Sequence, residues 1–130
     1  MRRAVRLADA YLPLAGPMAY RPVNVPDAPV ANVPASRYLR PWSPRLRPLE
    51  RLRLHRITAD LEHAARHGLT FHLWWHPHDF GVHLAENLAL LRGILRCFIG
   101  LRETHGMESL TMAEAAARLV AAIPAIAAAS

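Results

Sequence analysis

Apolar residues recur every three or four positions in two stretches of the chain, which is the spacing of one face of an α-helix. The first stripe contains Leu54, Ile57, Leu61 and Ala64. The second contains Leu84, Leu88, Leu91, Leu95 and Phe98. These stripes predict helices over residues 45–67 and 84–104, each with one side buried against the rest of the fold.

The ends of these helices carry local signals. Ser43 followed by Pro44 is typical of a helix start, because the hydroxyl can cap the first turn and proline suits the first helical position. Gly68 and Gly106 follow the two stripes and indicate where the helices end. The segment TMAE, residues 111–114, has capping-box spacing and predicts an Ala-rich helix after it, broken or kinked at Pro124.

A short aromatic run over residues 70–76 lies between the two helices and predicts a β-strand. Its apolar residues are Phe71, Leu73, Trp74 and Trp75. Both faces are therefore expected to be covered, as in a parallel strand buried between layers. Residues 107–110 are a candidate for one further short strand.

The N-terminal third is rich in proline. Nine of the eleven prolines lie between Pro13 and Pro48, which excludes a mostly helical structure for residues 12–44. Short extended pieces are expected around residues 23–25 and 30–33.

The order of predicted elements indicates the α/β class with few parallel strands and two or three long helices. We divide the chain into Pro-rich loops and short strands over 1–44, a helix-strand-helix-strand unit over 45–114, and an Ala-rich C-terminal helix over 115–130. Two or three strands alone would leave open edges, so this single partial domain is predicted to be a portion of a larger sheet or barrel.

Composition narrows the class of protein. A chain of 130 residues can form one domain with a core. The net charge of +6 suggests nucleic-acid binding, but all 16 basic residues are arginine and they are spread along the chain, which makes that reading the less favoured one. The single cysteine, Cys97, excludes an internal disulfide. No secretory signal or membrane span is recognisable, so a cytoplasmic location is expected.

The stretch FHLWWHPHDFG, residues 71–81, gathers three of the eight histidines and two of the three tryptophans. His76 is expected at the carboxyl end of the strand, where parallel α/β folds place their chemistry. Trp74 lies on the same side by the period of two, and a ring beside an imidazole suits a general acid or base. A histidine satisfied by backbone hydrogen bonds is an equally weighted alternative.

Metal binding is the other chemistry that this stretch suggests. His72 and His76 would lie about 13 Å apart along a straight strand, too far to share one zinc ion. His76, His78 and Asp79 could converge around Pro77, but no established zinc spacing supports them. No metal ligands are therefore assigned to this chain.

These residues also resemble a known family. FHLWWHPHDFG, followed by ENLALLRGIL and ESLTMAEAA, is similar to the C-terminal part of polysaccharide deacetylases of carbohydrate esterase family 4, the Nod-factor deacetylase-like group. RLADAYLPL and NVPASRYLRP resemble segments that precede this motif in longer members. The resemblance extends from about residue 6 to residue 117.

The resemblance implies a distorted (β/α) barrel with a divalent metal, usually zinc, that hydrolyses N-acetyl groups of amino sugars in polysaccharides. Trp74, Trp75 and His76 match the motif that ends a late strand of the family. By this match, His76 is the general acid that protonates the leaving amine, and Trp74 belongs to the acetyl or sugar pocket. His78 and Asp79 are assigned to the substrate groove.

The sequence departs from the family in its metal centre. The Thr-Phe-Asp-Asp segment and the His-Ser-x-x-His pair are absent, and a barrel of this kind needs on the order of 200 residues. The chain is therefore predicted to be a C-terminal fragment or subunit, inactive alone, whose zinc ligands would come from an N-terminal half or a partner chain. The alternatives are a non-catalytic interaction module derived from that fold and a small basic nucleic-acid-binding protein.

Overall fold

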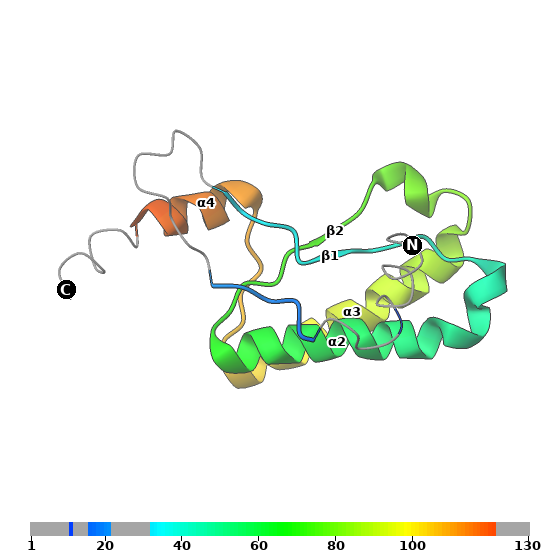
Figure 1. Cartoon of the computed structure of the whole chain (residues 1–130), viewed down its shortest axis with the longest axis horizontal. Coiled ribbons are helices and arrows are strands. Elements are labelled where there is room, and N and C mark those ends of the chain that lie inside the picture. Colours follow the sequence, from blue (N-terminus) through cyan, green and yellow to red (C-terminus); the bar gives the residue numbers. More distant parts are fainter. Residues whose placement is uncertain (1–10, 12–15, 22–31, 122–130) are drawn as a thin grey trace.

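The computed structural model describes residues 11, 16–21 and 32–121. Within them, a helical pair covers one side of a small parallel sheet (Figure 1). The elements in chain order are β1 (Arg37–Tyr38), η1 (Pro44–Leu49), α2 (Glu50–His67), β2 (Leu73–Trp74), η2 (Pro77–Phe80), α3 (Leu84–His105) and α4 (Met112–Ala121). The α/β class is confirmed in this general form.

The sheet consists of β1 and β2, which run parallel with Arg37 opposite Leu73 and Tyr38 opposite Trp74. Because α2 connects the two strands, they form a β-α-β unit. Figure 1 shows α2 and α3 running side by side, both opposite in direction to the strands. Two successive strand-helix units therefore pack in the same sense.

The strands differ from the prediction in extent and position. Only two residues of the predicted strand 70–76 pair in the sheet, although Thr70 also forms an isolated antiparallel bridge with Tyr20. Its partner β1 was not predicted, and residues 107–110 form no strand. The extended pieces expected at 23–25 and 30–33 lie outside the described residues, apart from residues 32 and 33, which are irregular.

The predicted helix 45–67 exists, but its first turns are 3-10 rather than α. Ser43 is extended and Pro44 occupies the first helical position, as predicted, yet the serine side chain makes no capping hydrogen bond. Pro48 lies inside η1 and has no N–H to donate, which disfavours a regular α-helical hydrogen-bond pattern before Glu50. Gly68 ends α2 in the left-handed conformation with φ of 59°, as predicted.

The stripe predicted for α3 is wrong in part. The helix spans Leu84–His105, close to the predicted 84–104, and ends at Gly106. Its buried apolar residues are Leu90, Ile94 and Leu101, whereas Leu84 and Leu95 are exposed. Leu88, Leu91 and Phe98 are half-buried at the side of the core. The buried face of α3 is thus rotated from the predicted stripe, and it also contains Asn87.

The capping box before the last helix is confirmed. The Glu114 carboxylate accepts a hydrogen bond from the Thr111 amide at 2.7 Å, and the Thr111 hydroxyl accepts one from the Glu114 amide at 3.2 Å. The pKa of Glu114 lies below its usual value because its carboxylate accepts hydrogen bonds from both the amide and the hydroxyl of Thr111. The helix begins at Met112 rather than 115, and Pro124 lies outside the described residues.

The core lies between the sheet and the two long helices. It is built from Leu39, Ile57, Leu61, Phe80, Leu90, Ile94 and Leu101, with Leu54, Phe71, Leu73 and Cys97 packed at its margin. The stripe predicted for α2 is confirmed, since Ile57, Leu61 and Ala64 are buried. Within the described residues, the long helices cover one face of the sheet, whereas Trp74 on the other face is 36% exposed, so the prediction that both faces are covered is not met at Trp74.

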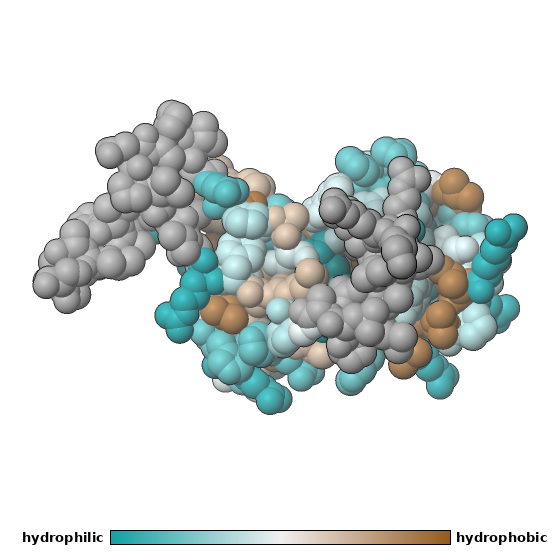
Figure 2. Space-filling view, in the orientation of Figure 1, coloured by the Kyte–Doolittle hydropathy of each residue, from teal (hydrophilic) through white to brown (hydrophobic). Residues whose placement is uncertain are grey.

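Several large apolar side chains remain at the surface. The most exposed are Val82, at 82%, Met112, Leu84 and Leu95. Figure 2 shows hydrophobic surface at the end of the molecule that carries η1 and the turn before α3. Among the described residues, no helix has the length and apolar character needed to cross a bilayer.

Gly93 lies at a close contact between α3 and Leu54 of α2. A Cβ atom placed there would lie 3.0 Å from a methyl carbon of Leu54, whereas one at Gly100 in the same helix would meet nothing within 4 Å. We expect Gly93→Leu to lower the free energy of unfolding by about 1–3 kcal/mol, because the added side chain pushes the helices apart. Urea unfolding measures this, and Gly100→Leu is the matched control. Equal effects of the two variants would contradict the assignment of Gly93 as a contact point.

Candidate functional site

The uncovered face of the sheet carries the predicted site residues. Arg37 and Leu73 point toward the helices, so their neighbours Tyr38 and Trp74 point to the opposite face, where their rings pack with centroids 4.6 Å apart. His76 follows the end of β2 and is exposed. Its ring meets Trp74 edge to face, with centroids 5.2 Å apart. The predicted pairing of Trp74 and His76 on one side is therefore present.

His76 lies at the exit of a parallel strand, as predicted. Its backbone is extended, with φ of −94° and ψ of 137°, which is the conformation favoured before Pro77. The residue is the N-cap of η2, and its carbonyl accepts a hydrogen bond from the Asp79 amide at 3.0 Å. The imidazole stacks on that of His78, with centroids 5.2 Å apart and an interplanar angle of 16°.

The Asp79 carboxylate stabilises the turn formed by η2. Its Oδ2 accepts hydrogen bonds from the Tyr38 hydroxyl at 2.5 Å and from the His76 backbone amide at 3.2 Å. Its Oδ1 lies 3.6 Å from Nε2 of the exposed His78. The carboxylate thus fixes the backbone of residue 76 to strand β1, and Tyr38 is a member of the site that sequence reasoning missed.

These contacts shift the pKa values of Asp79 and Tyr38 in opposite directions. The hydrogen bond from the Tyr38 hydroxyl favours the charged carboxylate and holds the pKa of Asp79 below its ordinary value, with smaller contributions from the His76 amide and the two imidazoles. Burial, and then the same hydrogen bond, raise the pKa of Tyr38. Because the folded-state pKa of Asp79 is depressed, its contribution to stability is present above the ordinary pKa and is lost as pH falls through the folded value.

We expect Tyr38→Phe to raise the pKa of Asp79 toward the ordinary aspartate value of about 3.9, because the main donor to the carboxylate is removed. The part of the free energy of unfolding that is lost on protonation of Asp79 should decrease as well. An NMR titration of the Asp79 carboxyl carbon measures the shift. Tyr20→Phe is the control, since the Tyr20 hydroxyl has no hydrogen-bond partner in the described part of the chain. An unchanged Asp79 pKa in Tyr38→Phe would contradict this role.

Asn87 is a second residue that the sequence did not reveal. It lies in the first turn of α3 and is 1% exposed. Its Oδ1 accepts a hydrogen bond from the Trp42 amide at 2.7 Å, and its Nδ2 lies 3.5 Å from the carbonyl oxygens of Asp79 and Phe80. It therefore joins η2 to the chain that leaves β1.

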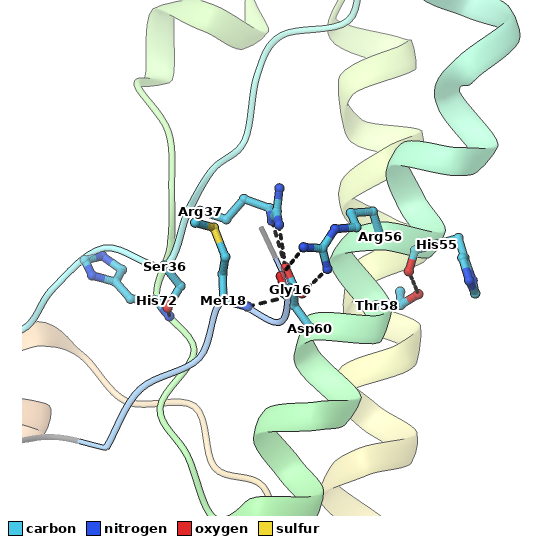
Figure 3. Close-up of polar contacts among 9 residues, drawn as sticks. All are labelled: Gly16, Met18, Ser36, Arg37, His55, Arg56, Thr58, Asp60 and His72. Atoms are coloured by element: carbon cyan, nitrogen blue, oxygen red, sulfur yellow. Dashed lines mark hydrogen bonds and ion pairs between the residues drawn. The ribbon is translucent and has the colours of Figure 1, made fainter. Parts of the chain in front are cut away.

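A buried ionic network positions β1 behind the site (Figure 3). Asp60 of α2 is 0% exposed, and its Oδ2 accepts from Arg37 Nε at 2.9 Å, with Arg37 Nη2 at 2.7 Å. Its Oδ1 pairs with Arg56 one turn earlier and accepts from the Met18 amide at 3.4 Å. Arg56 also donates to the Gly16 carbonyl. Asp60 thus ties together α2, β1 and residues 16–18.

The other histidines near the site do not join it. His72 is half-buried, and its Nδ1 lies 3.2 Å from the Pro34 carbonyl oxygen, on the approach to the sheet. His83 is the N-cap of α3 and packs edge to face on Trp42, with centroids 4.6 Å apart. Within residues 11, 16–21 and 32–121, no three His, Cys, Asp or Glu side chains form a group that could hold a metal ion.

A separate cavity of about 770 Å³ is bordered by α2, α3, α4 and the chain that leads into β2. Its walls include Phe71, Leu73 and Trp75 of the strand region, Phe98 of α3 and Met107 beyond it. None of the four predicted site residues lines this cavity.

The residues that meet on the uncovered face define a small aromatic and acid-base site. It has one exposed imidazole at a strand exit, two aromatic rings beside it, and a carboxylate that fixes the backbone of the imidazole-bearing residue. The rings of such a site can stack on the apolar face of a ligand such as a sugar, and the imidazole can transfer a proton to a polar group of that ligand. Comparisons with protein-family models, curated proteins and solved structures find no match for this chain.

Proposed function

We propose that this chain is the C-terminal part, or a C-terminal subunit, of a metal-dependent polysaccharide deacetylase, and that His76 is its general acid. The observation that carries the proposal is the position of His76. It is exposed just beyond a parallel strand, on the face of the sheet that the helices leave bare, with Trp74 and Tyr38 beside it. This is the position at which α/β barrels place catalytic side chains.

The arrangement of the elements supports a barrel segment. In a (β/α) barrel, parallel strands line the inside and helices cover the outside, each running back along its strand. Here β1, α2, β2 and α3 follow one another in that way, with α2 and α3 on a single face. A sheet of two short strands leaves its edges unpaired, so further strands would complete it.

The divalent metal of the resembled family does not fit the residues described here, because no group of three potential ligands occurs among them. We therefore derive no step through a metal in this chain. The metal centre would belong to the remainder of the enzyme. This chain would supply the general acid, which donates a proton to the leaving amine.

The proposed role of His76 is to deliver a proton to the amine that leaves when an N-acetyl group is hydrolysed, because an unprotonated amine is a poor leaving group. The Trp74 ring would form a wall of the acetyl or sugar pocket, since its face is apolar and partly exposed. Asp79 and Tyr38 would keep residue 76 in place through the hydrogen bond to its amide. His78, which is 80% exposed, would line the groove.

One observation favours a second candidate, a non-catalytic interaction module. Val82 and Leu84, at the start of α3, are 82% and 53% exposed, and exposed apolar surface of this kind is a feature of protein contact sites. In the first proposal this surface would meet the rest of the barrel. In the second it would bind a partner without any chemistry at His76.

Reconstitution distinguishes these candidates. The full chain should be produced with and without a polypeptide that carries the Thr-Phe-Asp-Asp and His-Ser-x-x-His segments, and acetate release from chitin oligosaccharides should be measured. We expect no acetate from the chain alone and acetate from the complex. A stable complex that releases no acetate would favour the interaction module, and the absence of both would contradict the two proposals.

A further inference from the structure

Two histidines on the outer surface of α2 form a pair that the proposed catalysis does not use. His63 and His67 are four residues apart, so their side chains lie on the same face of the helix. Their ring centroids are 4.2 Å apart, with an interplanar angle of 32°. His67 is exposed and His63 is half-buried. Rings at this separation are close enough to bind one cation from the same side.

The hydrogen bonding of His67 defines which nitrogen is available. Its Nδ1 lies 2.8 Å from the His63 carbonyl oxygen. A carbonyl can only accept, so Nδ1 carries the hydrogen, and in the neutral ring the lone pair is on Nε2. Histidines that bind metals commonly donate their other ring N–H to a backbone carbonyl in this way.

The charges around the pair suit a cation. His67 is the last residue of α2, where the free carbonyl groups of the helix end carry partial negative charge. The nearby positive charge of Arg66 is offset by Glu62, whose carboxylate lies 3.8 Å from the guanidinium. The described residues offer no third ligand for a closed site.

We propose that His63 and His67 form an open two-ligand site for a borderline divalent cation, with water in the remaining positions. Imidazole nitrogen suits Cu²⁺, Ni²⁺ and Zn²⁺ rather than Mg²⁺ or Ca²⁺, and Cu²⁺ should bind most tightly of the three. This site is independent of the proposed deacetylase activity, because it lies on α2 and not on the uncovered face of the sheet.

The test is a titration of the full chain with CuCl₂, followed by NMR. Paramagnetic broadening at one equivalent of Cu²⁺ should be centred on residues 63–67, and a chelator should reverse it. His63→Asn and His67→Asn should each abolish that broadening. ZnCl₂ should give diamagnetic shifts at the same residues, whereas MgCl₂ should give none.

His55→Asn is the matched control, since His55 is exposed on the same helix and is not part of the His63–His67 ring contact. It should retain the broadening in full. Broadening that persists when His63 and His67 are both replaced, that is centred on residues 76–79, or that does not occur at all would overturn the proposal. Far-UV circular dichroism of each variant separates loss of the site from loss of the helix.

Discussion

Replacement of Asp60 by alanine is expected to lower the free energy of unfolding by about 3–5 kcal/mol, the usual cost of breaking a buried ion pair. Asp60 is wholly buried and is the counter-charge for Arg37 and Arg56, which are themselves 8% and 6% exposed. Its removal would take this carboxylate away from two buried guanidinium groups, those of Arg37 and Arg56. Because a domain of this size has a total stability of about 5–15 kcal/mol, this loss is a large fraction.

Chemical denaturation followed by circular dichroism measures the effect. The matched control is Glu62→Ala in the same helix, since Glu62 is 47% exposed in its side chain and its pairing with Arg66 at 3.8 Å is a surface contact. That variant should change stability by no more than about 1 kcal/mol. If Asp60→Ala were as mild as Glu62→Ala, the network would not be what holds β1 against α2.

Replacement of His76 by alanine in the reconstituted enzyme is expected to lower kcat by about 10²–10⁴-fold, the usual contribution of a general acid or base. The side chain is exposed and makes ring contacts with Trp74, Tyr38 and His78. Its loss should therefore cost little stability. The bound metal should remain, because the proposed metal centre lies elsewhere.

Acetate release and metal content, measured on the same preparation, test this expectation together. His55→Ala is the control, since that histidine is exposed on α2, away from the sheet face that carries His76. Turnover that survives in His76→Ala would end the assignment of the general acid. Loss of both turnover and metal would indicate a structural role for the residue.

The local signals of the chain predicted its helices well. Gly68 and Gly106 end α2 and α3 as expected, because a left-handed backbone after a helix favours glycine. The Thr111–Glu114 capping box also formed, since its partners are only three residues apart. The position of His76 after a strand was predicted from Pro77 and the aromatic run, which are equally local.

Other features depend on residues that are distant in the sequence. β1 is only two residues long and has no repeating pattern, so its pairing with β2 could not be inferred from RYLR alone. The contact from Tyr38 to Asp79 spans 41 positions, and the contact from Arg37 to Asp60 spans 23. The sequence around each of these residues gives no indication of its partner.

The spacing of apolar residues along this chain is enough to specify where the long helices lie, because each turn buries the same side of its own helix. Spacing does not specify what that side packs against. Leu84 and Leu95 share the stripe of α3 but remain exposed, while Asn87 and Asp60 are buried, because the packing of α3 on α2 and of β1 on β2 determines which surfaces meet. The bare aromatic face around His76 arises in the same way: the helices cover the side of the sheet that bears Leu39 and Leu73, and leave the opposite side open.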